Sequence, residues 1–140
     1  MSFREKSAWV SLAAYLVVYG WYFWKVAAAM IAGDIHLVHL MNLLLASVIF
    51  LIQLEIVLHI IIAIQSPKDA MAPEDERERL IALKSHAVGY YIVSTGAVVA
   101  LGAIVFGVDS FHVANGLFLA LVLSVVAGYV SQIIRYRFGA

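Results

Sequence analysis

The stretch that decides the fold is residues 37–65, which read LVHLMNLLLASVIFLIQLEIVLHIIIAIQ. It is longer than the roughly 20 apolar residues that cross a hydrocarbon core about 30 Å thick. Glu55 is its one Asp, Glu, Lys or Arg residue, and His59 follows four positions later. The stretch therefore predicts a transmembrane helix that carries an acid and an imidazole at membrane depth.

Three further apolar stretches, each about as long as a membrane is thick, accompany it: residues 8–32, 86–108 and 113–134. The first is longer than the 7–15-residue apolar core of a signal peptide, so we expect it to be retained as a helix. Together the four stretches predict an all-α protein, a four-transmembrane-helix bundle that forms a single membrane domain over residues 1–140. Residues 66–85 are the polar connection between the second and third spans.

The overall composition agrees with lipid contact, since 64% of the 140 residues are hydrophobic and 13% are charged. Soluble domains average about 45–50% apolar and 25% charged residues. The absence of cysteine excludes disulfides and thiolate metal sites. The net charge of zero and the lack of enzyme or nucleic-acid motifs argue against an enzyme and against direct nucleic-acid binding.

The basic residues predict the orientation. Eight of nine fall before the first span, between the second and third, or after the fourth: Arg4, Lys6, Lys68, Arg77, Arg79, Lys84, Arg135 and Arg137. With four crossings these regions share one side, and Lys25 is the single exception. The positive-inside rule therefore predicts a multi-pass protein of the bacterial cytoplasmic (inner) membrane, with both termini and residues 66–85 in the cytoplasm.

The polar connection ends in a charged helix start, SPKDAMAPEDERERLIALK at residues 66–84. Pro73 suits a first helical position, so the third helix is expected to begin there in the cytoplasm and run unbroken into the membrane. Asp75 and Glu76 are spaced to pair with Arg79 along the helix. This segment is either a solvated, self-paired helix start or a docking surface for a cytoplasmic partner. Its contact motif consists of Asp75, Glu76, Arg77, Glu78 and Arg79.

The run from Asp75 to Ser85, DERERLIALKS, resembles a motif in a group of small bacterial four-span membrane proteins. In that group an acidic–basic stretch, an isoleucine and a lysine with a small residue lead into a transmembrane helix. Some of its members are encoded beside small DNA-binding regulators. The resemblance thus implies a membrane-tethered regulatory role, and it implies no catalytic residue.

Glu55 and His59 are the most costly residues in the sequence, because ionisable groups at membrane depth cost about 2.5–3.5 kcal/mol each on insertion scales. At 100° per residue they lie about 40° apart on one helix face. Three interpretations remain open. The pair is a structural hydrogen bond aided by hydroxyls of a neighbouring helix, a proton or ion relay, or part of a metal or haem site.

The other histidines define two candidate clusters. His86, on the third span, is a possible third member of an inner cluster with Glu55 and His59. An outer group would lie near Asp34 and Asp109, and its weak metal-ligand candidates are His36, His39 and His112. No cofactor is expected; haem b is the alternative.

Small and aromatic residues at helical spacing predict packing faces. The first span carries a stripe of Ser11, Tyr15, Tyr19 and Tyr22, which predicts a core seam whose hydroxyls meet Glu55 or Gln53. The later spans carry small residues for close helix approach: Gly89, Gly96, Ala100, Ala103, Ser124, Gly128 and Ser131.

From these observations we expect a non-enzymatic interaction or regulatory module, with residues 73–85 as its contact surface. The expected partners are the lipid bilayer, another copy or another membrane protein, and a cytoplasmic regulatory protein. The alternatives are a small oligomeric proton- or ion-coupled transporter using Glu55 and His59, and a haem- or quinone-linked membrane subunit.

Overall fold

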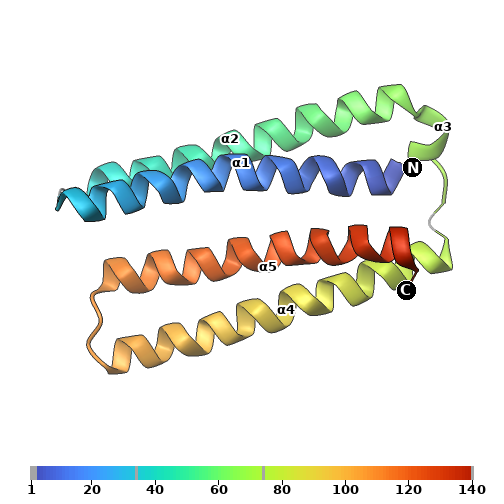
Figure 1. Ribbon diagram of the computed structural model, residues 1–140. Helices are drawn as coiled ribbons and strands as arrows, with labels where there is room; N and C mark the ends of the chain where they lie inside the picture. The colour runs from blue at the N-terminus through green and yellow to red at the C-terminus, as the bar shows by residue number, and fades with distance from the viewer. Residues whose placement is uncertain (1–2, 34, 74, 140) are drawn as a thin grey trace. The chain divides into compact units, whose positions relative to one another are not determined.

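The structure, a computed structural model, describes residues 3–33, 35–73 and 75–139. These residues form four long helices and one short one, and within them there is no strand. The helices are α1 (Phe3–Ala32), α2 (Leu37–Gln65), α3 (Pro67–Ala70), α4 (Glu76–Val105) and α5 (Ser110–Phe138) (Figure 1). Each long helix is long and apolar enough to cross a membrane. The predicted all-α fold with four spans is confirmed, and the chain is a multi-pass membrane protein.

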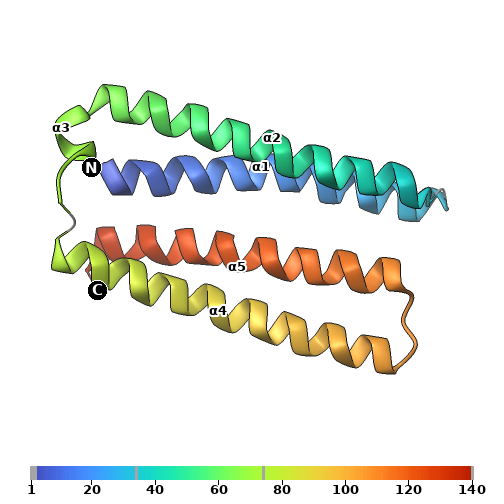
Figure 2. The ribbon, with the colours of Figure 1, turned by 180° about the vertical axis from the view of Figure 1, so that it is seen from behind.

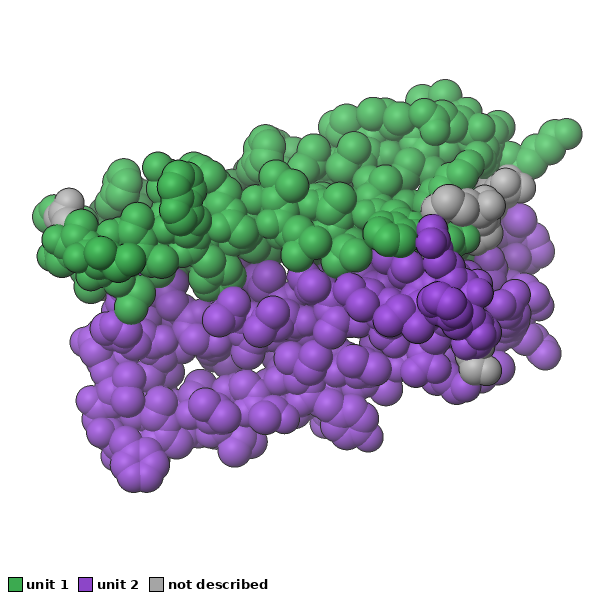
Figure 3. All heavy atoms as spheres, in the orientation of Figure 1, with its two compact units in different colours: residues 1–71 green, residues 72–140 purple. Residues whose placement is uncertain are grey.

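The chain divides into two compact units, residues 1–71 and 72–140, which Figure 3 colours green and purple. The first unit contains α1, α2 and α3, and the second contains α4 and α5. Within each unit the two long helices run antiparallel as a helical hairpin (Figures 1 and 2). The expectation of one domain over the whole chain and the cytoplasmic location of the termini both stay predictions.

The first hairpin turns at Gly33, whose φ of 70° lies in the left-handed region that favours glycine. The buried residues of α1 recur at helical spacing: Ala8, Ser11, Leu12, Ala14, Val18, Tyr19, Tyr22 and Val26. Tyr22 is 1% exposed and Tyr19 is 6% exposed. Three members of the predicted stripe, Ser11, Tyr19 and Tyr22, are therefore buried, and Tyr15 is half-buried.

The second hairpin depends on two close approaches between α4 and α5. A Cβ atom built on Gly89 would lie 2.8 Å from the backbone oxygen of Ser124, and one built on Gly96 would collide with the Cβ of Ala120. Such distances leave no room for any side chain. The small-residue faces predicted from the sequence are confirmed at these two glycines.

The start of α4 differs from the prediction. The helix begins at Glu76 rather than Pro73, because Asp75 has an extended backbone (φ −75°, ψ 151°) and acts as the N-cap. The backbone N–H of Arg79 donates to the Asp75 carbonyl over 3.0 Å. An N-cap lies off the regular helix surface, and no side-chain pair joins Asp75 or Glu76 to Arg79 within the described ranges. From Glu76 the helix then runs unbroken for 30 residues, as predicted.

Large apolar side chains point outward along most of α4. Val98 is 68% exposed, Leu101 is 64% exposed and Ile104 is 58% exposed. In water such a surface would drive aggregation, whereas in a bilayer the lipid chains cover it at no cost. The exposure therefore agrees with the membrane assignment.

Candidate functional site

The first hairpin brings Glu55 and His59 of α2 opposite two serines of α1. The hydroxyl of Ser11 donates to Oε2 of Glu55 over 2.8 Å, and Oγ of Ser7 lies 2.6 Å from Nε2 of His59. Ser7 and Ser11 are one helical turn apart on α1, and Glu55 and His59 are one turn apart on α2. The antiparallel register therefore places the two serines level with the acid and the imidazole, and these four residues are called the Glu55–His59 cluster below.

The hydrogen bonds within the cluster assign the histidine tautomer. Nδ1 of His59 lies 2.8 Å from the backbone oxygen of Glu55 and 3.2 Å from Oε2 of the same residue. Both oxygens accept hydrogen bonds, so Nδ1 carries a proton and donates it. In the neutral imidazole, Nε2 is then the acceptor, and the hydroxyl of Ser7 donates to it.

The cluster tolerates a second proton on the imidazole. A serine hydroxyl both donates and accepts, so Ser7 only has to rotate its hydrogen when Nε2 becomes N–H. The imidazolium then faces the Glu55 carboxylate as an ion pair across the 3.2 Å contact. His59 can therefore exchange a proton without losing a hydrogen-bond partner.

The second carboxyl oxygen of Glu55 differs from the first in its surroundings. Oε1 of Glu55 is inaccessible to solvent and has no hydrogen-bond partner within the described ranges. The Glu55 side chain is 20% exposed and that of His59 is 38% exposed. A buried polar atom without a partner costs about 1–3 kcal/mol, so Oε1 is the energetically most costly atom of the cluster.

His86 lies on α4 in the second unit, where it lines a cavity of about 340 Å³. Its convergence with Glu55 and His59 stays a prediction, because the two residues of the cluster belong to the first unit. Within the part of the chain that the structure describes, no group of three or more His, Cys, Asp or Glu residues lies close enough together to hold a metal ion.

The outer histidines lie at the two hairpin turns. His36 and His39 line a cavity of about 470 Å³ in the first unit, together with Lys25. His112 lies in the second unit, where its Nδ1 is 3.7 Å from Oδ1 of Asp109. Joint ligation by all three stays a prediction, and Asp34 lies outside the described residues.

Sequence reasoning anticipated Ser11 as a partner of Glu55, since it placed this residue in the buried seam of the first span. It missed Ser7. The available signal was the spacing: Ser7 and Ser11 are four residues apart, the same separation as Glu55 and His59. Two antiparallel helices with matching spacings bring such pairs into register.

The predicted contact motif lies at the start of α4, where Asp75, Glu76, Arg77 and Arg79 are exposed and Glu78 is half-buried. Just beyond it, Ile81 is completely buried and Ser85 is 3% exposed, whereas Leu80 and Leu83 are more than half exposed. The motif and the two leucines therefore form a surface that is both charged and apolar.

Comparison of the chain with protein-family models, curated proteins and solved structures gave no match. A fold of four apolar helices serves many unrelated functions, so the function has to be inferred from the chain's own residues.

Proposed function

We propose that this protein is a non-enzymatic membrane protein that binds a soluble regulatory protein through the first three turns of α4. The observation that carries the proposal is the exposure of two leucines within a charged helix segment. Leu80 is 53% exposed and Leu83 is 57% exposed, while Ile81 between them is buried. The buried side attaches the segment to its own unit, and the leucine side is left for a partner.

The exposed residues share one helix face. At 100° per residue, Glu76, Leu80, Leu83 and Lys84 fall within about 100° of one another. An apolar centre with a charged rim is the usual anatomy of a protein–protein contact, and a helix face with anchors at such spacing fits a groove on a partner. We call this face the α4 docking surface.

Charge indicates the kind of partner. The start of α4 carries equal numbers of acidic and basic residues: Asp75, Glu76 and Glu78 against Arg77, Arg79 and Lys84. The basic excess comes from Arg135 and Arg137 in the last turn of α5. Because α4 and α5 are antiparallel, the end of α5 lies beside the start of α4 (Figure 1). The expected partner therefore presents an apolar groove edged with acidic residues.

The placement of this surface in the bacterial cytoplasm is part of the proposal. It is supported by the eight basic residues that four crossings would gather on one side. The resemblance of DERERLIALKS to the small four-span proteins also favours a regulatory partner, since some of those proteins are encoded beside DNA-binding regulators.

Site-specific crosslinking in cells tests the proposal. A photo-reactive amino acid at Leu83 should crosslink the full chain to a soluble protein, and the crosslink should disappear when Arg77 and Arg79 are both replaced by alanine. Lys68→Ala, in the other unit, is the matched control and should leave it intact. Crosslinks at Leu83 to lipid alone, or crosslinks that survive the double substitution, contradict partner binding.

The Glu55–His59 cluster favours a second candidate function, a small oligomeric proton- or ion-coupled transporter. It is supported by the unpartnered Oε1 of Glu55 and by a histidine that gains a proton without losing a hydrogen bond. Intramembrane acid–imidazole pairs are typical of proton pathways.

Proton flux into liposomes separates this candidate from a purely structural cluster. Glu55→Gln keeps the shape of the side chain and removes its titration, so a transporter should lose at least about 90% of its flux, as expected for loss of an essential proton site. Glu76→Gln, on the exposed helix start, is the control. Unchanged flux in Glu55→Gln protein of normal stability contradicts transport through this residue.

A further inference from the structure

The second hairpin contains a cavity of about 340 Å³ between α4 and α5, and neither proposed function uses it. This volume lies within the range of about 300–1,000 Å³ typical of small-molecule sites. Every wall of the cavity belongs to the second unit: Ala82, Ser85, His86, Gly89, Tyr90, Val93, Ser124, Val125, Gly128, Tyr129 and Gln132.

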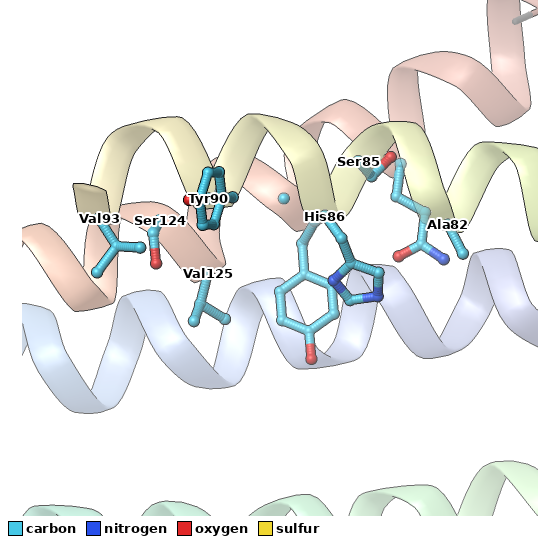
Figure 4. A pocket seen from close by; sticks show the side chains of 11 residues that line it. Ala82, Ser85, His86, Tyr90, Val93, Ser124 and Val125 are labelled. Atoms are coloured by element: carbon cyan, nitrogen blue, oxygen red, sulfur yellow. The ribbon is translucent and has the colours of Figure 1, made fainter. Parts of the chain in front are cut away.

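The polarity of the lining changes along the cavity. Val93 and Val125 lie toward one end together with Ser124 and Tyr90, and Ser85 and His86 lie toward the other together with Ala82 (Figure 4). At the first end the hydroxyl of Ser124 is already bonded within its own helix. Gln132 is one turn beyond Gly128 on α5, which places it at the polar end. A ligand that fits this gradient has a polar head and an apolar continuation that points toward the middle of the helices.

The hydrogen-bonding groups define the polar head. The hydroxyl of Ser124 already donates to the Leu121 carbonyl over 2.7 Å, and that of Ser85 donates to Ser131 over 3.5 Å. His86, Tyr90 and Gln132 make no side-chain hydrogen bond to any residue that the structure describes. Each of these three side chains has an N–H or O–H donor beside an acceptor, so together they can bind a head that carries hydrogen-bond acceptors.

The charge and shape of the lining further restrict the class of ligand that the cavity can bind. No Asp, Glu, Lys or Arg lines the cavity, so a phosphate or ammonium head would lack its counter-ion there. Gly128 leaves the α5 backbone bare, and the aromatic side chains of Tyr90 and Tyr129 also line the cavity. Bare backbone and aromatic rings together suit a flat ring.

The geometry points to a binding site for a neutral, membrane-dissolved quinone in this cavity. The two ring carbonyls accept hydrogen bonds from the donors of His86, Tyr90 and Gln132, and the isoprenoid tail leaves between Val93 and Val125. The site shares no residue with the α4 docking surface or the Glu55–His59 cluster, so its test does not depend on either of them.

Calorimetric titration of decylubiquinone into the full chain in detergent micelles tests the site. We expect one saturable site per chain, in contrast to the non-saturable partition of the probe into empty micelles. Absence of saturable binding overturns the inference. Displacement of the probe by an equal concentration of phosphatidylglycerol also overturns it, because the cavity would then be a lipid site.

Two substitutions locate the binding. A Cβ on Gly128 meets its nearest neighbour, the Ser85 backbone oxygen, at 3.7 Å, so Gly128→Leu is accommodated at its base and fills the cavity. It should weaken binding at least about tenfold, the scale expected when a ligand is sterically excluded. Gly116→Leu, where nothing lies within 4 Å, is the matched control on the same helix and should bind as the original chain does.

Gln132→Leu tests the chemistry instead of the space, because it removes a donor and keeps the bulk. Loss of one hydrogen bond should weaken binding about fivefold. If Gly128→Leu fails to give the helical circular-dichroism spectrum, Gln132→Leu decides the matter. Unchanged affinity in a folded Gly128→Leu or Gln132→Leu protein contradicts a quinone in this cavity.

Discussion

Inside the first hairpin, the Ser11 hydroxyl is the partner that α1 supplies to the Glu55 carboxylate, besides the contact with Nδ1 of His59 on its own helix. Ser11 is 1% exposed and donates to Oε2 over 2.8 Å, while Oε1 has no partner among the described residues. Water cannot easily replace the hydroxyl at such a site, so its removal exposes the full desolvation cost of the oxygen.

Ser11→Ala is therefore expected to lower the free energy of unfolding by about 1–3 kcal/mol. Ser47→Ala is the matched control, since Ser47 is also buried, at 3% exposure, but its hydroxyl donates to the Leu44 carbonyl of its own helix. That change should cost about 0.5–1 kcal/mol or less. Unfolding in mixed detergent micelles measures both, and equal losses would mean that the bond to Glu55 adds nothing.

At two glycines of α4 the same substitution is expected to act in opposite directions. Gly96→Ala places a methyl group against Ala120 of α5 and should destabilise the fold by about 1–3 kcal/mol. Gly102→Ala meets nothing within 4 Å and should stabilise it by about 0.5–1 kcal/mol through helix propensity. Thermal unfolding compares the two variants, and a stable Gly96→Ala protein would refute the close approach of the helices.

At the scale of the element, the two helices of the second hairpin each have an aspartate as N-cap, and the two caps differ in their hydrogen bonding. Asp109 accepts a hydrogen bond from the Phe111 backbone N–H over 2.8 Å, whereas Asp75 makes no side-chain cap bond. The carboxylate of Asp75 therefore acts on its helix only through its charge near the positive end of the helix dipole.

Asp109→Ala should accordingly cost about 1 kcal/mol of unfolding free energy, and Asp75→Ala only a few tenths, about 0.3 kcal/mol. Raising the salt concentration should remove most of the smaller effect and leave the larger one, because screening acts on exposed charges and not on a short hydrogen bond. Denaturant titration at two salt concentrations measures both, and an equal cost for the two variants would count against this assignment of caps.

At the scale of the whole molecule, each hairpin returns the chain to the end at which it started, so the proposed orientation is testable at both turns. The chain has no cysteine, which allows single-cysteine labelling without a background. Met71 and Phe138 are more than 80% exposed near the proposed cytoplasmic ends, and Ile31 and Phe106 are equally exposed near the turns.

A membrane-impermeant maleimide applied to intact cells should label Ile31→Cys and Phe106→Cys and spare Met71→Cys and Phe138→Cys, because it reaches only the outer side of the membrane. All four should react after the cells are opened, which controls for reactivity. Labelling of Phe138→Cys in intact cells would reverse the orientation and remove the α4 docking surface from the cytoplasm.

The sequence by itself determined the class and the number of spans. Residues 37–65 predicted α2 to the residue, because an uninterrupted apolar run ends where polar residues begin. The start of α4 was displaced by three residues from Pro73 to Glu76. Proline and aspartate both favour helix starts, and only the backbone conformation of Asp75 shows which one caps the helix.

Only the tertiary structure decided what surrounds the costly residues. Spacing placed Glu55 and His59 on one face of their helix, but the register of α1 against α2 determined that Ser7 and Ser11 satisfy them. Likewise, the cavity beside His86 arises where two consecutive antiparallel helices bring together residues that lie far apart in sequence. Periodicity is a local property of one helix, whereas hydrogen-bond partners and cavities depend on the register in which two helices pack.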